Sequence, residues 1–183
     1  MKIKKLAFLS TLFAILLPTL VVATVVLSYT YSTSTSGVAP EVYLAQGPNY
    51  AAANAIGLFY ANQAGSPANI SSGTKIYFNY TYGASNEALL NVLEIVNNVP
   101  SGNTVKVTFD RLSLPNGVTM YISSAANTEL SYTVSNGVIT ISNGNQVSGS
   151  QITLSSGTYY IGFLFGINAQ PGTGTIALSY QIS

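Results

Sequence analysis

Hydrophobic positions along this chain recur mainly with a period of two, the spacing that places side chains on one face of a β-strand. The stretch TKIYFNYTYG shows the pattern most clearly, with Ile76, Phe78, Tyr80 and Tyr82 on one face. Further strands are predicted in EVYLA, NTVKVTFDRL, VTMYIS, QITLSSGTYYIGFLFGI and GTIALSYQIS, each bounded by turn residues. The pattern therefore favours an all-β chain built from short strands.

Alternation also assigns the buried faces of two later strands. In NTVKVTFDRL the inward residues are expected to be Val105, Val107 and Phe109. In GTIALSYQIS they are expected to be Ile176, Leu178, Tyr180 and Ile182. The stretch LSYTVSNGVITIS predicts a hairpin, because Asn136-Gly137 supplies the pair of positive φ angles that a type I′ turn requires.

One segment, SNEALLNVLEIVNN, is compatible with either a helix or a strand. A helix would share one face among Leu89, Leu90, Leu93 and Val96. A strand would align Leu90, Val92 and Val96, with Glu94 interrupting that face. We favour the strand, because the segment lies between other strands with short connections. The stretch ANAIGLFYANQ predicts a short helix or strand, and residues 41–183 as a whole predict an antiparallel β-sandwich.

A long alternating strand is also predicted ahead of this domain, in TVVLSYTYSTST. Its apolar face consists of Val25, Leu27, Tyr29 and Tyr31. Fully extended, the quoted stretch would reach roughly 40 Å, which is longer than a typical strand of about 5–6 residues. Gly and Pro then interrupt the pattern, so residues 24–36 are predicted to be a separate strand and residues 37–40 a linker.

The first residues, MKIKKLAFLSTLFAILLPTLVVA, have the basic start, apolar middle and small-residue end of a secretory signal peptide. Cleavage between Ala23 and Thr24 would remove residues 1–23 and make Thr24 the new N-terminus of an exported protein. Two alternatives fit the same residues. The apolar stretch 6–27 is long enough to remain as a membrane anchor, or it could be a type IV pilin helix whose leader is cut ahead of the apolar stretch.

Composition narrows the functional classes. Charged residues make up 6% of the chain, and there is no histidine and no cysteine. Without histidine the chain lacks the commonest general base and the commonest metal ligand. Without cysteine it has no thiol chemistry. We therefore expect neither an enzyme nor a cofactor. Outside the three lysines of the first five residues, three basic side chains stand against five acidic ones. We expect no nucleic-acid partner, because phosphate binding needs a basic patch.

Two sequons mark candidate N-glycosylation sites in an exported chain. They are Asn69-Ile70-Ser71, in a predicted loop, and Asn79-Tyr80-Thr81, within a predicted strand. Sequons also arise by chance in Asn-, Ser- and Thr-rich sequence, so occupancy stays open at both.

The N-terminal strand could pair in three ways. It could be the first strand of its own sandwich, or a stalk above an anchor, or it could insert into a neighbouring copy and complete that copy's sheet by donor-strand complementation. In the third arrangement the donor and acceptor surfaces differ. The contact is then head-to-tail and does not close, so it generates a filament.

The Lys-rich leader, the strand VVLSYTYSTST, the stretches VYLAQGPN and LLNVLEIVNN, and the Cys-free Ser/Thr/Tyr-rich β-domain together resemble archaeal surface filament subunits. These are the thread and bundling-pilus proteins of hyperthermophilic archaea, which are related in fold to the bacterial biofilm fibre protein TasA. The resemblance implies a jelly-roll-like domain, a cleaved signal and a homopolymeric extracellular filament joined by the N-terminal donor strand. It also implies adhesion to other filaments or cell surfaces, biofilm formation or cell–cell contact, often with N-glycans. Only two sequons are present, which is fewer than a densely glycosylated filament would show.

A different class of function fits the same composition: a membrane-anchored, monomeric surface module that binds glycans by stacking them on tyrosines. Its candidate residues are Tyr77, Tyr80, Tyr82, Tyr159 and Tyr160, although tyrosines at strand spacing more often form core and cross-strand pairs.

Overall fold

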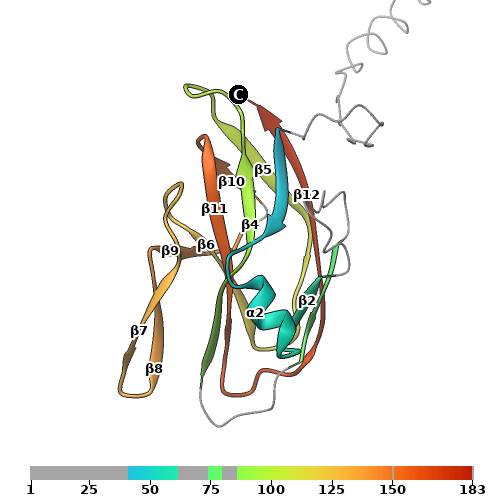
Figure 1. Ribbon diagram of the computed structural model, residues 1–183, viewed down its shortest axis with the longest axis vertical. Coiled ribbons are helices and arrows are strands. Elements are labelled where there is room, and N and C mark those ends of the chain that lie inside the picture. Colours follow the sequence, from blue (N-terminus) through green and yellow to red (C-terminus); the bar gives the residue numbers. More distant parts are fainter. Residues whose placement is uncertain (1–40, 62–73, 80–85, 150, 183) are drawn as a thin grey trace, which may run out of the picture. The chain divides into compact units, whose positions relative to one another are not determined.

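The computed structural model describes residues 41–61, 74–79, 86–149 and 151–182 (Figure 1). All of them fall within one structural unit, Tyr31–Ser183. The predicted signal peptide, the cleavage site, the donor strand and the linker lie outside the described residues.

Ten of the described strands form two antiparallel sheets (Figure 1). The first sheet has the order β1-β4-β11-β6-β9, with β1 at Val42–Gln46, β4 at Glu87–Asn97, β11 at Gly157–Phe165, β6 at Val118–Ser123 and β9 at Gly144–Gln146. The second has the order β10-β5-β12-β3-β2, with β10 at Gln151–Leu154, β5 at Val105–Ser113, β12 at Gly172–Ile182, β3 at Thr74–Phe78 and β2 at Phe59–Ala61. A separate hairpin pairs β7 at Ser131–Ser135 with β8 at Val138–Ser142, and one helix, α2, spans Tyr50–Ala55.

Aromatic side chains join the two sheets. The ring of Phe163, on β11 of the first sheet, lies 4.8 Å from that of Phe78 and 5.8 Å from that of Phe59, both on the second sheet. Phe78 also contacts Phe165 at 5.4 Å, edge-on. Such tilted and edge-on pairs stabilise a core beyond the area they bury. The chain is therefore sandwich-like, and the prediction of an antiparallel all-β sandwich is confirmed at that level.

Several local predictions are also confirmed. Val105, Val107 and Phe109 are buried on β5, and Ile76 and Phe78 are buried on β3. Asn136 and Gly137 have φ angles of 51° and 76° at the tip of the β7–β8 hairpin, as a type I′ turn requires. Of the helix or strand allowed for ANAIGLFYANQ, both occur: the stretch holds the last three residues of α2 and, after a short turn, the strand β2.

The segment SNEALLNVLEIVNN is a strand, as favoured, but the predicted face is only partly right. Leu90 and Val92 are buried as predicted, but from Leu93 onward the buried side chains are Leu93, Ile95 and Asn97, while Val96 is half-buried on the other face. The cause is a bulge: Asn91 has φ = 56°, and the register against β11 jumps from Ile161↔Leu93 to Phe163↔Leu89. A bulge changes which residues face the core on its far side.

The last strand departs from expectation only at its end. Ile176 is buried, Leu178 and Tyr180 pack partly buried against the core, but Ile182 is 44% exposed. Within the described part of the chain, no helix is long and apolar enough to cross a membrane.

Candidate functional site

Among the described strands, none covers one edge of β4 along part of its length. Its residues 93–97 pair with β1 on one side and with β11 on the other. Residues 87–89 pair with β11, and no other described strand pairs with them. An unpaired strand edge presents free N–H and C=O groups and is a ready template for another strand.

After β1 ends, the chain turns away from the edge of β4 at the position of the bulge, and this leaves residues 87–89 without β1 as a neighbour. Gly47 N donates to Val92 O and Asn49 N donates to Asn91 O, both at 3.0 Å. A Cβ atom on Gly47 would overlap the carbonyl oxygen of Asn91, so only glycine allows the backbones to approach this closely. Tyr50 N then donates to Gly47 O at 3.0 Å, and α2 begins. The turn thus takes the chain from the sheet edge into a helix.

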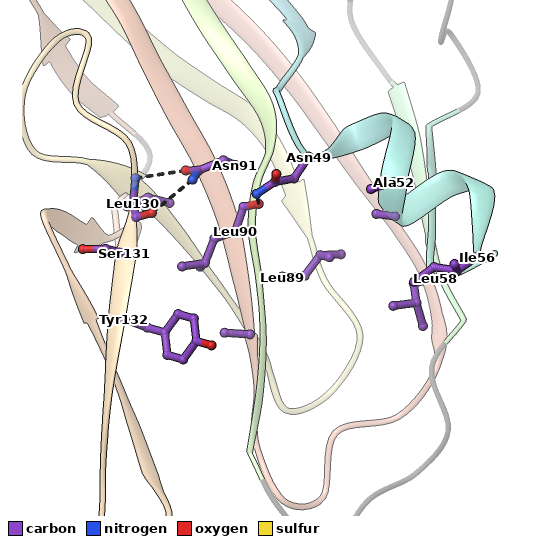
Figure 2. A pocket seen from close by; sticks show the side chains of 12 residues that line it. Asn49, Ala52, Ile56, Leu58, Leu89, Leu90, Asn91, Leu130, Ser131 and Tyr132 are labelled. Atoms are coloured by element: carbon purple, nitrogen blue, oxygen red, sulfur yellow. Dashed lines mark hydrogen bonds between the residues drawn. The ribbon is translucent and has the colours of Figure 1, made fainter.

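A groove of about 520 Å³ lies along the open part of β4 (Figure 2). We call it the β4 groove. It is lined from the α2 side, from β4 itself and from the root of the β7–β8 hairpin by Asn49, Ala52, Ala53, Ile56, Leu58, Ala88, Leu89, Leu90, Asn91, Leu130, Ser131 and Tyr132. None of these residues is charged, so the groove suits an uncharged, largely apolar occupant.

Asn91 fixes the hairpin side of the groove. Its side chain is 3% exposed and forms a pair of hydrogen bonds with the Leu130 backbone: Leu130 N donates to Oδ1 at 2.9 Å, and Nδ2 donates to Leu130 O at 3.0 Å (Figure 2). Nδ2 also donates to Glu129 Oε2 at 3.3 Å. The residue that makes the bulge therefore also docks the hairpin root against β4.

Asn49 fixes the opposite side. Its Nδ2 donates to Leu90 O at 2.9 Å, which ties the start of α2 to the open edge (Figure 2). Tyr50 and Ala53 are buried, and the Tyr50 hydroxyl accepts from Ala61 N at 3.3 Å. With that face of the helix in the core, Ile56 just beyond it remains 71% exposed beside the groove.

Leu90 and Leu130 pack together over Gly162 of β11. A Cβ atom at Gly162 would lie 2.9 Å from Leu90 Cδ2 and 3.0 Å from Leu130 Cδ1. The absence of a side chain there lets both leucines settle onto the sheet, and each is buried to 9% exposure or less. These two leucines are not part of the main core cluster and form a small apolar layer at the base of the β7–β8 hairpin.

One carboxyl group of β4, outside the groove lining, has a shifted pKa. Partial burial raises the pKa of Glu94, which lies on the doubly paired half of β4 opposite Ala45 and Tyr160. Among the described residues, no group of three or more His, Cys, Asp or Glu side chains could hold a metal ion.

Most residues singled out from the sequence fall outside the described part of the chain. These are Ala23 and Thr24 at the cleavage site, Val25, Leu27, Tyr29 and Tyr31 of the donor strand, and Asn69 of the first sequon. Asn79 is described: it is exposed just after β3 rather than within a strand, and its N–H donates to Leu58 O at 3.0 Å.

The three tyrosine candidates that the structure describes are not gathered into one surface. Tyr159 is 6% exposed, and its hydroxyl accepts from Ser155 N at 3.0 Å, so its ring belongs to the core. Tyr160, its neighbour on β11, is half-buried. Tyr77 is exposed and packs against Tyr60 with ring centroids 5.7 Å apart. Tyr80 and Tyr82 lie outside the described residues.

Sequence reasoning did not find the β4 groove. The one residue in the sequence that could have indicated the bulge beside the groove is Asn91. It is a polar residue in the middle of an apolar run, and asparagine tolerates a positive φ. The partners that complete the groove are about 40 residues away on either side in the sequence, and their approach depends on tertiary packing. Comparison with protein-family models, with curated proteins and with solved structures gives no match for this chain.

Proposed function

We propose that this protein is the structural subunit of an extracellular filament or pilus, polymerised head-to-tail by insertion of the N-terminal strand of one copy into the next. On this proposal residues 1–23 are a cleaved signal peptide, residues 24–36 are the donor strand, and the sandwich is a jelly-roll-like acceptor domain. The filament would serve adhesion, biofilm formation or cell–cell contact.

The β4 groove is the observation that supports the proposal. It combines an edge at residues 87–89 that no other described strand covers with an uncharged lining from three separate parts of the chain. Residues 24–36 are also uncharged and alternate like a strand. An added strand can pair with the open backbone edge while its side chains contact the groove lining, which is the general mode of strand addition.

The energy available from such a contact is large enough for a stable joint. Burial of four large apolar side chains, Val25, Leu27, Tyr29 and Tyr31, contributes about 1.5–3 kcal/mol each, or roughly 6–12 kcal/mol. Ordering the segment and joining two molecules oppose this, and main-chain hydrogen bonds to β4 add to it. Because the strand leaves one copy and enters another, each subunit both donates and accepts, and the chain of contacts continues.

The test is a matched pair of substitutions in the full chain, examined by electron microscopy and sedimentation. Leu27→Asp places a charge in an uncharged groove and should abolish fibres, whereas Leu27→Val keeps the position apolar and should retain them. Deletion of residues 24–36 should also abolish fibres without preventing export. Fibres from either the deletion or the Leu27→Asp chain would overturn the proposal.

A mixing experiment tests the head-to-tail geometry. The Leu27→Asp chain keeps its groove, and a Leu89→Glu chain keeps its donor strand but carries a charge in the groove. Mixed together, they should form pairs that cannot extend. Circular dichroism of each variant checks that the sandwich is intact.

N-terminal sequencing of surface material distinguishes the other readings of the leader. A chain beginning at Thr24 supports the donor-strand subunit. A chain that keeps its apolar stretch indicates an anchored surface module, and a chain cut among residues 6–10 indicates a type IV pilin. Intact mass of the same material reports whether Asn69 or Asn79 carries a glycan.

A further inference from the structure

The β7–β8 hairpin has one apolar face and one hydroxyl-rich face. The cross-strand pairs Tyr132↔Ile141 and Val134↔Ile139 alternate with the pairs Ser131↔Ser142 and Thr133↔Thr140. Because alternate pairs in a two-stranded ribbon point to opposite sides, the first two pairs share one face. We call that face, formed by Tyr132, Val134, Ile139 and Ile141, the hairpin apolar face.

This apolar face is only partly covered. Tyr132 is 56% exposed and Val134 is 60% exposed, while Ile139 and Ile141 are half-buried. The hairpin stands apart from both five-stranded sheets (Figure 1), and a two-stranded ribbon alone is marginally stable in water. An amphipathic ribbon with an uncovered apolar face gains stability when another chain covers it.

The hairpin apolar face continues the wall of the β4 groove. Tyr132 belongs to both, and its ring points toward β4 across the groove (Figure 2). Next to it along the chain, Leu130 is held against β4 by the two Asn91 hydrogen bonds. A segment bound in the β4 groove would therefore contact the hairpin at the point where the segment extends beyond the β4 edge.

We propose that the β7–β8 hairpin is a clasp: its apolar face packs on the N-terminal segment of a second copy of this chain while that segment lies in the β4 groove. This inference rests on the proposed function and adds a second contact to it. The β4 edge would supply backbone pairing, and the hairpin would cover side chains that the edge leaves facing water.

Length and charge both favour residues 24–36 as the occupant. Extended, they reach roughly 40 Å, whereas five residues of a hairpin strand span about 17 Å. One segment is thus long enough to occupy the groove and also run along the hairpin. The segment and residues 131–142 contain no charged side chain, so their contact desolvates no charged side chain.

Single cysteines provide the test, because the natural chain has none. Val134→Cys reports the hairpin apolar face, Thr133→Cys reports the opposite face of the same strand, and Ala88→Cys reports the β4 groove. Each is labelled with a maleimide in fibres and again in the dispersed Leu27→Asp chain. Assembly should slow labelling at positions 134 and 88 by about tenfold or more, as burial in a stable contact requires, and leave position 133 unchanged.

A disulfide between copies identifies the occupant. A Val134→Cys chain is mixed with a chain carrying Ser28→Cys or Tyr29→Cys, which lie on opposite faces of the segment, and the mixture is oxidised. A mixed disulfide with either position is expected, and the equivalent Thr133→Cys mixtures should give none. A mixed disulfide that forms equally well from position 133 would overturn the clasp.

The labelling pattern separates the two proposals. Slowed labelling at position 88 alone would overturn the clasp and leave the donor strand in place. Normal labelling at position 88 in fibres would overturn donor insertion at the β4 groove, and with it the clasp. Slowed labelling at position 134 in fibres of a chain that lacks residues 24–36 would show that another part of the second copy covers the hairpin, and would also overturn both.

Discussion

The two halves of β4 share one strand but have opposite surroundings. Residues 93–97 have hydrogen-bonded neighbours on both sides, β1 and β11, and Leu93, Ile95 and Asn97 are 1% exposed or less. Residues 87–89 pair with β11 alone among the described strands, and Ala88 and Leu89 are half-buried beside a groove. One half is therefore part of the core, and the other lies along a groove with one edge that no described strand covers.

A single residue separates the halves. Asn91 adopts a positive φ, makes the bulge, accepts the last backbone contact from the departing chain and docks the hairpin root. Bulges commonly end pairing and re-aim side chains at the edges of sheets. The comparison teaches that one residue with a positive φ can divide a long strand into a doubly paired half and a half with a single described neighbour.

The largest expected loss of stability comes from a substitution in the doubly paired half of β4. Ile95 is fully buried, so Ile95→Ala should lower the free energy of unfolding by about 2–5 kcal/mol. Denaturant unfolding of the dispersed Leu27→Asp chain measures it, with half-buried Val96→Ala as the adjacent control of smaller effect. An equal loss from both variants would contradict the distinction between the two faces.

The next largest loss of stability is expected at Asn91, the residue that separates the two halves of β4. Asn91→Ala should cost about 2–4 kcal/mol, since the buried N–H and C=O of Leu130 both lose their partners. Asn91→Gly loses the same hydrogen bonds but accepts the positive φ, so it should be more stable than Asn91→Ala by about 1 kcal/mol. If the two unfold at the same denaturant concentration, backbone strain at the bulge is not part of the cost.

A substitution in the open half of β4 should affect fibre assembly more than it affects the stability of the fold. Leu89→Ala removes a half-buried side chain and should cost only about 1–2 kcal/mol of stability, yet fibre formation should require a higher protein concentration. Leu112→Ala, a half-buried leucine on β5 away from the groove, is the matched control and should leave the critical concentration unchanged. Equal effects of both variants on assembly would argue against the groove as the acceptor.

The smallest effect is a pH dependence at Glu94. Its pKa is raised by burial from the ordinary value of 4.5, so the folded state holds the proton more tightly than the unfolded state does. Stability is therefore greater below pH 4.5 and falls as pH rises through the folded pKa. Glu94→Gln should raise Tm at pH 7 by about 3 °C or less, and the gain should vanish near pH 4. A gain that is constant with pH would exclude ionisation as its cause.

The sequence by itself determined the local elements. Alternation located the strands with their inward residues Val105, Val107 and Phe109, and Asn136-Gly137 located a hairpin turn, because side-chain period and turn dihedrals depend on near neighbours. Alternation also predicts a strand at residues 24–36, which the described residues do not include.

Only the tertiary structure decided how these strands combine. The pattern of β4 predicted a buried Val96 and missed the buried Leu93, Ile95 and Asn97, because a bulge shifts the alternation and its position depends on the neighbouring strand. The groove unites residues 49–58, 88–91 and 130–132, and its two asparagine anchors span separations of 41 and 39 residues. Side-chain periodicity is a local property, whereas an open edge exists only once every neighbouring strand has taken its place.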